Sequence, residues 1–132
     1  MADIDDLKAT FEQIVGVINR RDPNAYASYF HEQMVAFPPF FPFAVDGKAA
    51  ARQFAEANLA NPNTESTSFT PLNPQYRVIG STGIVWGHTA LSLKPKDGPL
   101  STSFIRFTFV LVKTEGKWLE ACVHFSQLPT GN

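Results

Sequence analysis

The sequence is poor in charged residues and has almost no cysteine. Charged side chains make up 17% of the 132 residues, and the formal net charge is -1 with the basic residues scattered along the chain. A chain without a basic stripe or block lacks the electrostatic surface typical of proteins that bind nucleic acid or acidic membranes. The single cysteine, Cys122, excludes an internal disulfide and fits a reducing compartment. We therefore expect neither nucleic acid nor a membrane as a partner.

Long apolar segments and cofactor motifs are also missing. The first residues, MADIDD, are acidic where a signal peptide is basic, and the most apolar run is interrupted by Arg106. No glycine-rich phosphate loop or flavin motif is visible. The three histidines, His31, His88 and His124, lack the close spacing of metal ligands. These absences predict a soluble, cytoplasmic protein that needs no cofactor and binds no metal.

The first half of the chain has apolar residues at helical spacing. The pattern predicts a helix over residues 4–20, a short second helix opened by Asp22-Pro23, and a third helix over residues 48–59. A short apolar strand over residues 34–37 separates the last two helices and ends at Pro38.

The second half of the chain consists of four predicted strands. Apolar runs separated by turn residues place them at 66–79, 84–93, 102–112 and 118–127. Consecutive strands with short connections pair antiparallel, so these four form a meander. With 44% hydrophobic residues, the chain is long enough for one core. We predict one α+β domain, residues 1–132, in the order αα-β-α-ββββ, with its helices against one face of the sheet.

Five short motifs, spread over nearly the whole chain, carry a family resemblance. They are Asn19-Arg20-Arg21-Asp22, Val45-Asp46-Gly47-Lys48, Arg106-Phe107-Thr108, Gly116-Lys117-Trp118 and His124-Phe125-Ser126. In order and spacing the chain resembles the nuclear transport factor 2-like superfamily, in its SnoaL-like and ketosteroid isomerase-like branch, close to the calcium/calmodulin-dependent kinase association domains. The resemblance implies a cone: a strongly curved sheet wraps a long helix and leaves a pocket open at one end. It also implies a homodimer paired through the outer face of the sheet.

The acid and base groups of ketosteroid isomerases are not where this resemblance would place them. The family pattern puts the base directly before a proline at the end of the first strand, where this chain has Phe37. It puts the tyrosine eight residues before Asp22, at Ile14, and a second acid in the strand over 101–113, which contains no Asp or Glu. Proton abstraction beside a carbonyl needs such a base and donors for the developing charge. Steroid-type isomerisation by that mechanism is therefore not expected.

Arg106 is the first candidate for a functional residue, because an arginine in an apolar strand is costly unless something pairs with it. If the turn at residues 113–116 sets a symmetric hairpin, Arg106 lies beside His124, on the same face as Ser126. The family resemblance implies that this side of the strands faces inward. We expect Arg106 to hold a ligand carboxylate or enolate in the hollow, with His124 as a donor or proton shuttle. The alternative is an internal partner such as Glu120.

The other side of these two strands is expected to face outward. It carries large apolar residues: Phe107, Phe109, Leu111, Leu119, Ala121, Val123 and Phe125. An outer face of this kind should not be left in water, so the pattern favours a homodimer through it. Cys122 is expected on the inner side as a small core residue.

Two histidine positions admit two interpretations each. Trp86 and His88 share one face of the neighbouring strand, and the strand register decides whether that is the pocket face. His31-Glu32 is expected at the end of the second helix, where a protonated histidine suits the helix dipole. A catalytic His–Glu dyad is the alternative there.

Aromatic residues supply the expected walls of the pocket. Phe37, Phe40 and Phe41 belong to the proline-rich segment over residues 37–43. This segment is either a rigid apolar lid or wall for a hydrophobic ligand, or a loop that plugs the cone or packs in the dimer. Tyr26 either donates a hydrogen bond into the cone or packs with its hydroxyl outward.

Two functions fit these observations. The first is a pocket for a small apolar or carboxylate-bearing molecule, with cofactor-free isomerase, cyclase or dehydratase chemistry if the protein is an enzyme. The second is a non-catalytic homo-oligomerisation or accessory domain, because the same scaffold serves unrelated functions. An Arg106 capped by an internal acid would favour the second.

Overall fold

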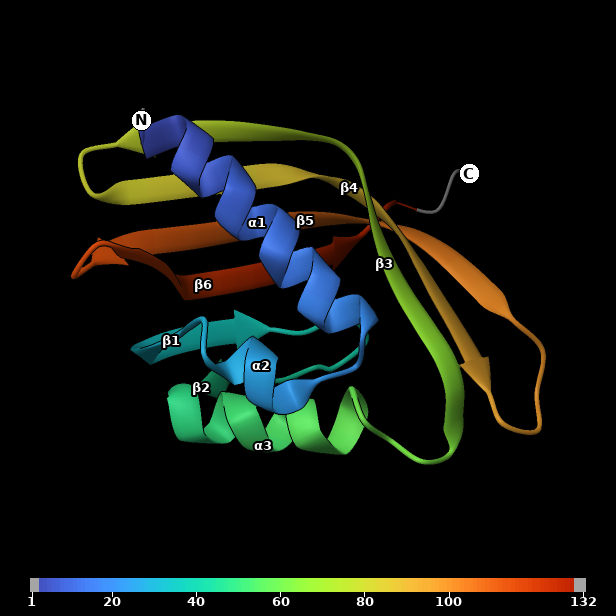
Figure 1. The fold of residues 1–132 in the computed structure, drawn as a ribbon. Coiled ribbons are helices and arrows are strands. Elements are labelled where there is room, and N and C mark those ends of the chain that lie inside the picture. The colour runs from blue at the N-terminus through green and yellow to red at the C-terminus, as the bar shows by residue number, and fades with distance from the viewer. Residues whose placement is uncertain (1–2, 130–132) are drawn as a thin grey trace.

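The computed structural model describes residues 3–129 as helices packed against a six-stranded sheet (Figure 1). The elements are α1 (Asp3–Asn19), α2 (Pro23–Ala27), β1 (Phe30–Phe37), β2 (Val45–Asp46), α3 (Lys48–Asn58), β3 (Thr64–Ile79), β4 (Thr82–Pro95), β5 (Ser101–Thr114) and β6 (Lys117–Gln127). The strand order is β2-β1-β6-β5-β4-β3. Strands β3 to β6 form an antiparallel meander, and β1 joins β6 in parallel. No helix in this range is long and apolar enough to cross a membrane.

This architecture confirms the predicted α+β class and the meander. The four long strands begin and end within two residues of the predicted bounds. The second helix also begins as predicted, because the Asp22 side chain accepts a hydrogen bond of 3.0 Å from the amide of Ala25 and Pro23 takes the first helical position.

The region around β1 differs from the prediction. Strand β1 begins at Phe30, so His31 and Glu32 lie in a strand and the expected helix-end position is wrong. They form no dyad either: His31 Nδ1 accepts from the Gln33 amide at 3.0 Å, and Glu32 lies 3.8 Å from the Lys48 ammonium. Residues 45 and 46, for which no strand was predicted, pair with β1 as the short strand β2.

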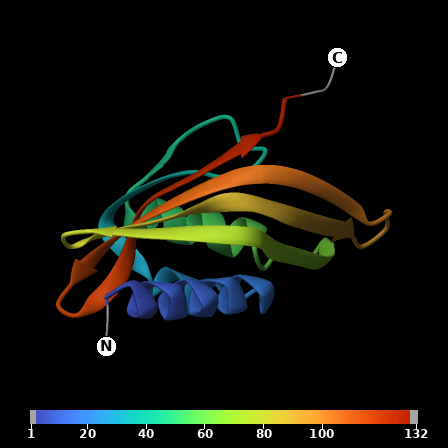
Figure 2. The same ribbon diagram turned by 90° about the horizontal axis from the view of Figure 1, so that it is seen from above.

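The core lies between α1 and the inner face of the bent sheet (Figure 2). α1 buries Leu7, Phe11, Ile14 and Val17, whose spacing of three to four residues puts them on one side of the helix. Phe11 stacks on Phe107 at 5.6 Å between ring centroids and meets other rings edge-on. This aromatic cluster fixes which side of each strand faces the helix.

A one-residue bulge in β6 changes which of its side chains face the core. Leu111 pairs with Glu120, but the preceding residue of β5, Val110, pairs with Cys122, so Ala121 is an extra residue. Before the bulge, Trp118 and Glu120 are buried on the inner side. After it the alternation is inverted, and the inner side is taken by Val123 and Phe125.

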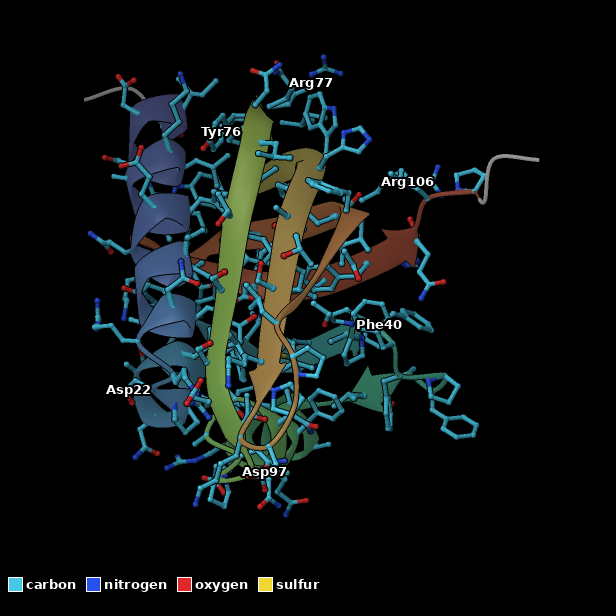
Figure 3. All side chains as sticks on the ribbon, turned by 90° about the vertical axis from the view of Figure 1, so that its right-hand side faces the viewer. Asp22, Phe40, Tyr76, Arg77, Asp97 and Arg106 are labelled. Carbon is cyan, nitrogen blue, oxygen red and sulfur yellow. The ribbon has the colours of Figure 1, made fainter. Side chains whose placement is uncertain are left out.

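The bulge and the burial of the phenylalanines overturn the predicted orientation of β5 and of the end of β6. Phe107, Phe109 and Leu111 are at most 2% exposed and pack under α1, so they face inward rather than outward. Arg106, on the opposite side of β5, is exposed on the outer face. Figure 3 shows Arg106 on the side of the sheet away from α1. The apolar argument for a homodimer through the outer face therefore no longer holds, and the dimer stays a prediction.

Candidate functional site

An apolar cavity of about 210 Å³ lies between the end of α1, α2, α3 and the inner face of the sheet. No charged side chain among residues 3–129 lines it. The aromatic lining residues are Tyr26, Phe54, Phe69 and Phe125, and the aliphatic ones are Ile18, Ala51, Ala55, Leu59 and Leu91. Pro38 and Pro39 close one side, and Asn58, Thr67 and Ser68 add polar groups. A concave, mainly apolar space with few polar groups is the usual form of a small-molecule site.

Tyr26 links this cavity to a buried acid. Its ring lines the cavity and lies 4.7 Å from the ring of Phe30, and its hydroxyl donates a hydrogen bond of 3.1 Å to Glu120 Oε1. Glu120 is 0% exposed, and its second oxygen, Oε2, has no hydrogen-bond partner among residues 3–129. A buried acid with one unpartnered oxygen is rare in folded proteins and marks a candidate functional group.

Burial changes the protonation of this pair. Desolvation raises the pKa of Glu120 to about 8, although the hydrogen bond from Tyr26 acts in the opposite direction. Burial and the neighbouring Glu120 both raise the pKa of Tyr26 well above its ordinary value. No ion pair among the described residues includes Glu120, so no cation offsets the cost of its charge. At neutral pH the pair consists mainly of a carboxylic acid and a phenol.

Arg21 holds the rim of the cavity in place. It has a left-handed backbone conformation, with φ of 58°, two residues after the end of α1. Its guanidinium donates to the carbonyl oxygens of Leu59 at 2.9 Å, Asn61 at 2.8 Å and Glu65 at 3.2 Å. The planar fork of an arginine suits several acceptors at once. The residue thus ties the end of α1 to the α3–β3 connection, which carries the cavity-lining Leu59.

The structure separates the predicted pocket residues from the cavity. The predicted Arg106–His124 pair is not formed, because Arg106 pairs with Ser126 and His124 pairs with Thr108 on the outer face. His88 pairs with Arg106 and Trp86 with Thr108, so both lie on the outer face as well. Cys122, expected inside, also lies on this face. Of the predicted polar residues only Tyr26 lines the cavity, and its hydroxyl donates to the buried Glu120 instead of facing outward.

The proline-rich segment borders the cavity with its prolines rather than its phenylalanines. Phe37 packs on His124 on the outer face, with 5.1 Å between ring centroids. Phe40 is 59% exposed, and Phe41 packs at 4.9 Å on Phe54, a lining residue. The segment therefore acts as one wall of the cavity and does not plug it.

Glu120 is a functional candidate that the sequence pattern does not reveal. The pattern indicates it only as a partner for Arg106, whereas its partner is Tyr26. A signal was present, because Glu120 is the only acid of β6 and stands between the apolar residues Leu119 and Ala121. An acid in such a strand is as costly as the arginine that was singled out.

Other hollows and clusters are weaker candidates. A space of about 410 Å³ beside α1 is lined mostly by exposed side chains, among them Glu12, Gln13 and Arg20, and contains no buried acid. Within residues 3–129 no three His, Cys, Asp or Glu side chains gather as metal ligands would.

A model of the SnoaL-like domain family matches residues 7–130. The chain belongs to the SnoaL-like domain family. No curated protein matches it by sequence.

Solved structures share its fold at low identity. A candidate dehydratase of the NTF2-like family from Streptomyces avermitilis has a TM-score of 0.86 at 18% identity, with 97% of each chain covered. A candidate calcium/calmodulin-dependent protein kinase II association domain from Xanthomonas campestris has a TM-score of 0.81 at 21% identity, covering 93% of this chain and 86% of that one. A candidate scytalone dehydratase from Novosphingobium aromaticivorans has a TM-score of 0.82 at 15% identity, covering 96% and 85%. These likenesses confirm the NTF2-like cone fold predicted from the sequence.

Proposed function

We propose that the protein binds a small, mainly apolar, uncharged molecule in the cavity and acts on it by acid–base chemistry without a cofactor, as an isomerase, cyclase or dehydratase. The observation that carries this proposal is the neutral, buried carboxyl of Glu120, hydrogen-bonded to Tyr26 at the cavity wall. Perturbed acids beside an apolar cavity are typical of sites that transfer protons.

The pair can present a proton to a ligand through Tyr26. A phenol and a neutral carboxyl each donate one hydrogen bond and accept others. When Glu120 donates to the Tyr26 oxygen, the Tyr26 proton is free to point into the cavity toward a carbonyl or hydroxyl oxygen. A hydrogen-bonded chain of this kind is polarised along its length, which makes the terminal hydroxyl a stronger donor. A pKa near 8 also lets Glu120 give up and regain a proton near neutral pH.

The uncharged character of the ligand follows from the lining. No Lys, Arg or His side chain lines the cavity, so a carboxylate would enter it without a counter-charge. The carboxylate-bearing ligand expected from Arg106 therefore does not suit this cavity. A ketone, an enone or a hydroxylated ring suits it better, since each offers one neutral oxygen and an apolar body.

The alternative, a non-catalytic oligomerisation domain, gains no specific support. An internal acid on Arg106 would have favoured it, but no ion pair among residues 3–129 includes Arg106. The candidate dehydratases among the structural neighbours agree with acid–base chemistry but share only the fold.

Binding of acetophenone, a neutral aromatic ketone, tests this proposal. In ¹⁵N-labelled protein we expect its addition to shift amide signals of residues 51–59 and 67–69. Tyr26→Phe should weaken binding about three- to tenfold, because one hydrogen bond to the ligand is lost. Tyr29→Phe is the matched control, since the Tyr29 hydroxyl bonds to Gln13 on the exposed side. Equal binding by the wild type and Tyr26→Phe, or shifts confined to other segments, would refute the proposal.

A further inference from the structure

The volume of the cavity limits the ring system that it can hold. An apolar cavity of about 150 Å³ accommodates one benzene molecule, which has six non-hydrogen atoms. By the same ratio, the cavity of about 210 Å³ between α2, α3 and the sheet accommodates about eight or nine such atoms. That number corresponds to one six-membered ring with a short substituent. A ketone on two fused rings exceeds it.

The aromatic lining residues are held by other rings behind them. Phe69 is 2% exposed and lies 5.6 Å from Phe107 and 6.0 Å from Phe125 between ring centroids. Tyr26 meets Phe30 edge-on at 4.7 Å. A wall packed at interior density moves only by straining its neighbours. We therefore expect these rings to keep their positions when a ligand binds.

Two further walls are fixed through the backbone. The proline rings of Pro38 and Pro39 lock the φ angle on one side of the cavity. On another side, the Arg21 guanidinium holds the carbonyl oxygen of Leu59 at 2.9 Å and so ties this lining residue to the end of α1. The cavity is thus built to keep its volume, which makes the size of a ligand decisive for binding.

Polar lining residues mark the place where the cavity reaches the solvent. Asn58, at the end of α3, is exposed, and Thr67 and Ser68 of β3 are half-buried. A ring that extended past these residues would bury little apolar surface and would cover groups that bond to water. A second ring therefore gains no affinity at the mouth of the cavity.

Two alanines of α3 leave room for the ligand. Ala51 and Ala55 are four residues apart and lie on one side of the helix, and both border the cavity although they are only 5% and 6% exposed. A longer side chain at either position would project into the cavity. Phe54, between them in sequence, is the largest α3 side chain in the lining. The face of α3 thus determines how much of the volume a ligand can use.

We propose that the cavity accepts neutral ketones on one six-membered ring and rejects those on two fused rings, and that Ala51, Phe54 and Ala55 are the residues that determine this specificity. The inference rests on the proposed function, because it takes the Tyr26 hydroxyl as the group that binds the ketone oxygen. The expected order is the reverse of that set by hydrophobicity, since by buried apolar area alone the larger ketone would bind more tightly.

Binding of acetophenone and 2-acetylnaphthalene, which carry the same ketone on one ring and on two, tests the size limit. In ¹⁵N-labelled protein we expect acetophenone to bind about tenfold or more tightly, because the second ring overfills a packed cavity. Ala55→Leu should weaken acetophenone binding about tenfold or more, and the smaller change Ala55→Val should weaken it less. Phe54→Ala should raise the affinity for 2-acetylnaphthalene about tenfold, because it makes space for the second ring.

Ala57→Leu is the matched control, since it makes the same change on the exposed side of α3 and should leave both affinities as in the wild type. Thermal unfolding confirms that each variant is folded, and Phe54→Ala and Ala55→Val carry the test if Ala55→Leu does not fold. Equal or tighter wild-type binding of 2-acetylnaphthalene, with acetophenone binding still weakened by Tyr26→Phe, would overturn the size limit and leave the proposed function standing. Acetophenone binding that does not depend on Tyr26 would instead refute the proposed function and the size limit with it. Unchanged affinities in the α3 variants would overturn the role of that helix.

Discussion

Replacement of Glu120 by glutamine should change how the stability of the protein depends on pH. In the unfolded chain this carboxyl loses its proton near pH 4.5, but in the folded protein it keeps it up to a pKa of about 8. Between these values the folded state binds more protons than the unfolded state, so the free energy of unfolding falls as pH rises. The stabilisation is complete below about pH 4.5 and is lost as pH approaches 8.

The size of the effect follows from the same two values. They differ by about 3.5 pH units, which corresponds to roughly 5 kcal/mol at about 1.4 kcal/mol per unit. Glutamine has a similar shape and no proton to lose. Between pH 5 and pH 9 the wild type should therefore lose roughly 4 kcal/mol more of its unfolding free energy than Glu120→Gln does.

Urea unfolding at several pH values, followed by circular dichroism, measures this difference. Glu56→Gln is the control, because Glu56 is exposed and pairs only with Arg52. Its pH profile should run parallel to that of the wild type. A parallel profile for Glu120→Gln as well would refute the reasoning, since it would mean that Glu120 titrates alike in the folded and unfolded chain.

Three further substitutions test the packing around the site by urea unfolding. Phe11→Ala should cost about 3–5 kcal/mol because it empties the centre of the aromatic core, and a cost under 1 kcal/mol would contradict that packing. Gly83→Ala should cost about 1–3 kcal/mol, because the new methyl group would lie 2.8 Å from a Leu7 methyl, and shortening Leu7 to Ala in the same chain should recover part of the loss. Arg21→Lys should speed amide hydrogen exchange over residues 59–65, because three carbonyls lose their shared donor; unchanged exchange there would show that the arginine does not hold the rim.

The fold could be predicted because its local signals are strong. The helical spacing of Leu7, Phe11 and Ile14 identifies α1, and apolar runs between glycine-containing turns identify the four long strands. Strand β1 was predicted four residues too short, because the turn after α2, at Ser28 and Tyr29, contains no Gly or Pro that would mark the change.

The sequence could not predict which side chains of β5 and β6 face the cavity, because a change of one residue in the strand pairing decides it. The last hairpin turns on Glu115 and Gly116, with φ of 51° and 81°, so Thr114 pairs with Lys117. This register is one residue away from the symmetric hairpin assumed for Arg106 and His124. The bulge at Ala121 adds a second one-residue change. A slip of one residue moves every side chain of a strand to its other face.

The contact between Tyr26 and Glu120 was beyond sequence analysis for a different reason. The two residues are 94 positions apart, and their hydrogen bond exists only because Tyr29 and Phe30, just after α2, pair with Glu120 of β6. The sequence shows an acid in an apolar strand, where its burial is costly. It does not identify the side chain that forms a hydrogen bond with this acid.

A ¹³C NMR titration of the Glu120 side-chain carboxyl, assigned with Glu120→Gln, shows whether this group is a neutral acid in the folded protein. We expect a midpoint near pH 8 in the free protein. We also expect a higher midpoint with saturating acetophenone, because a ligand oxygen that accepts from Tyr26 stabilises the neutral acid. A midpoint near 4.5, or one that does not move when the ketone is bound, would contradict a proton-donating pair at the wall of this cavity.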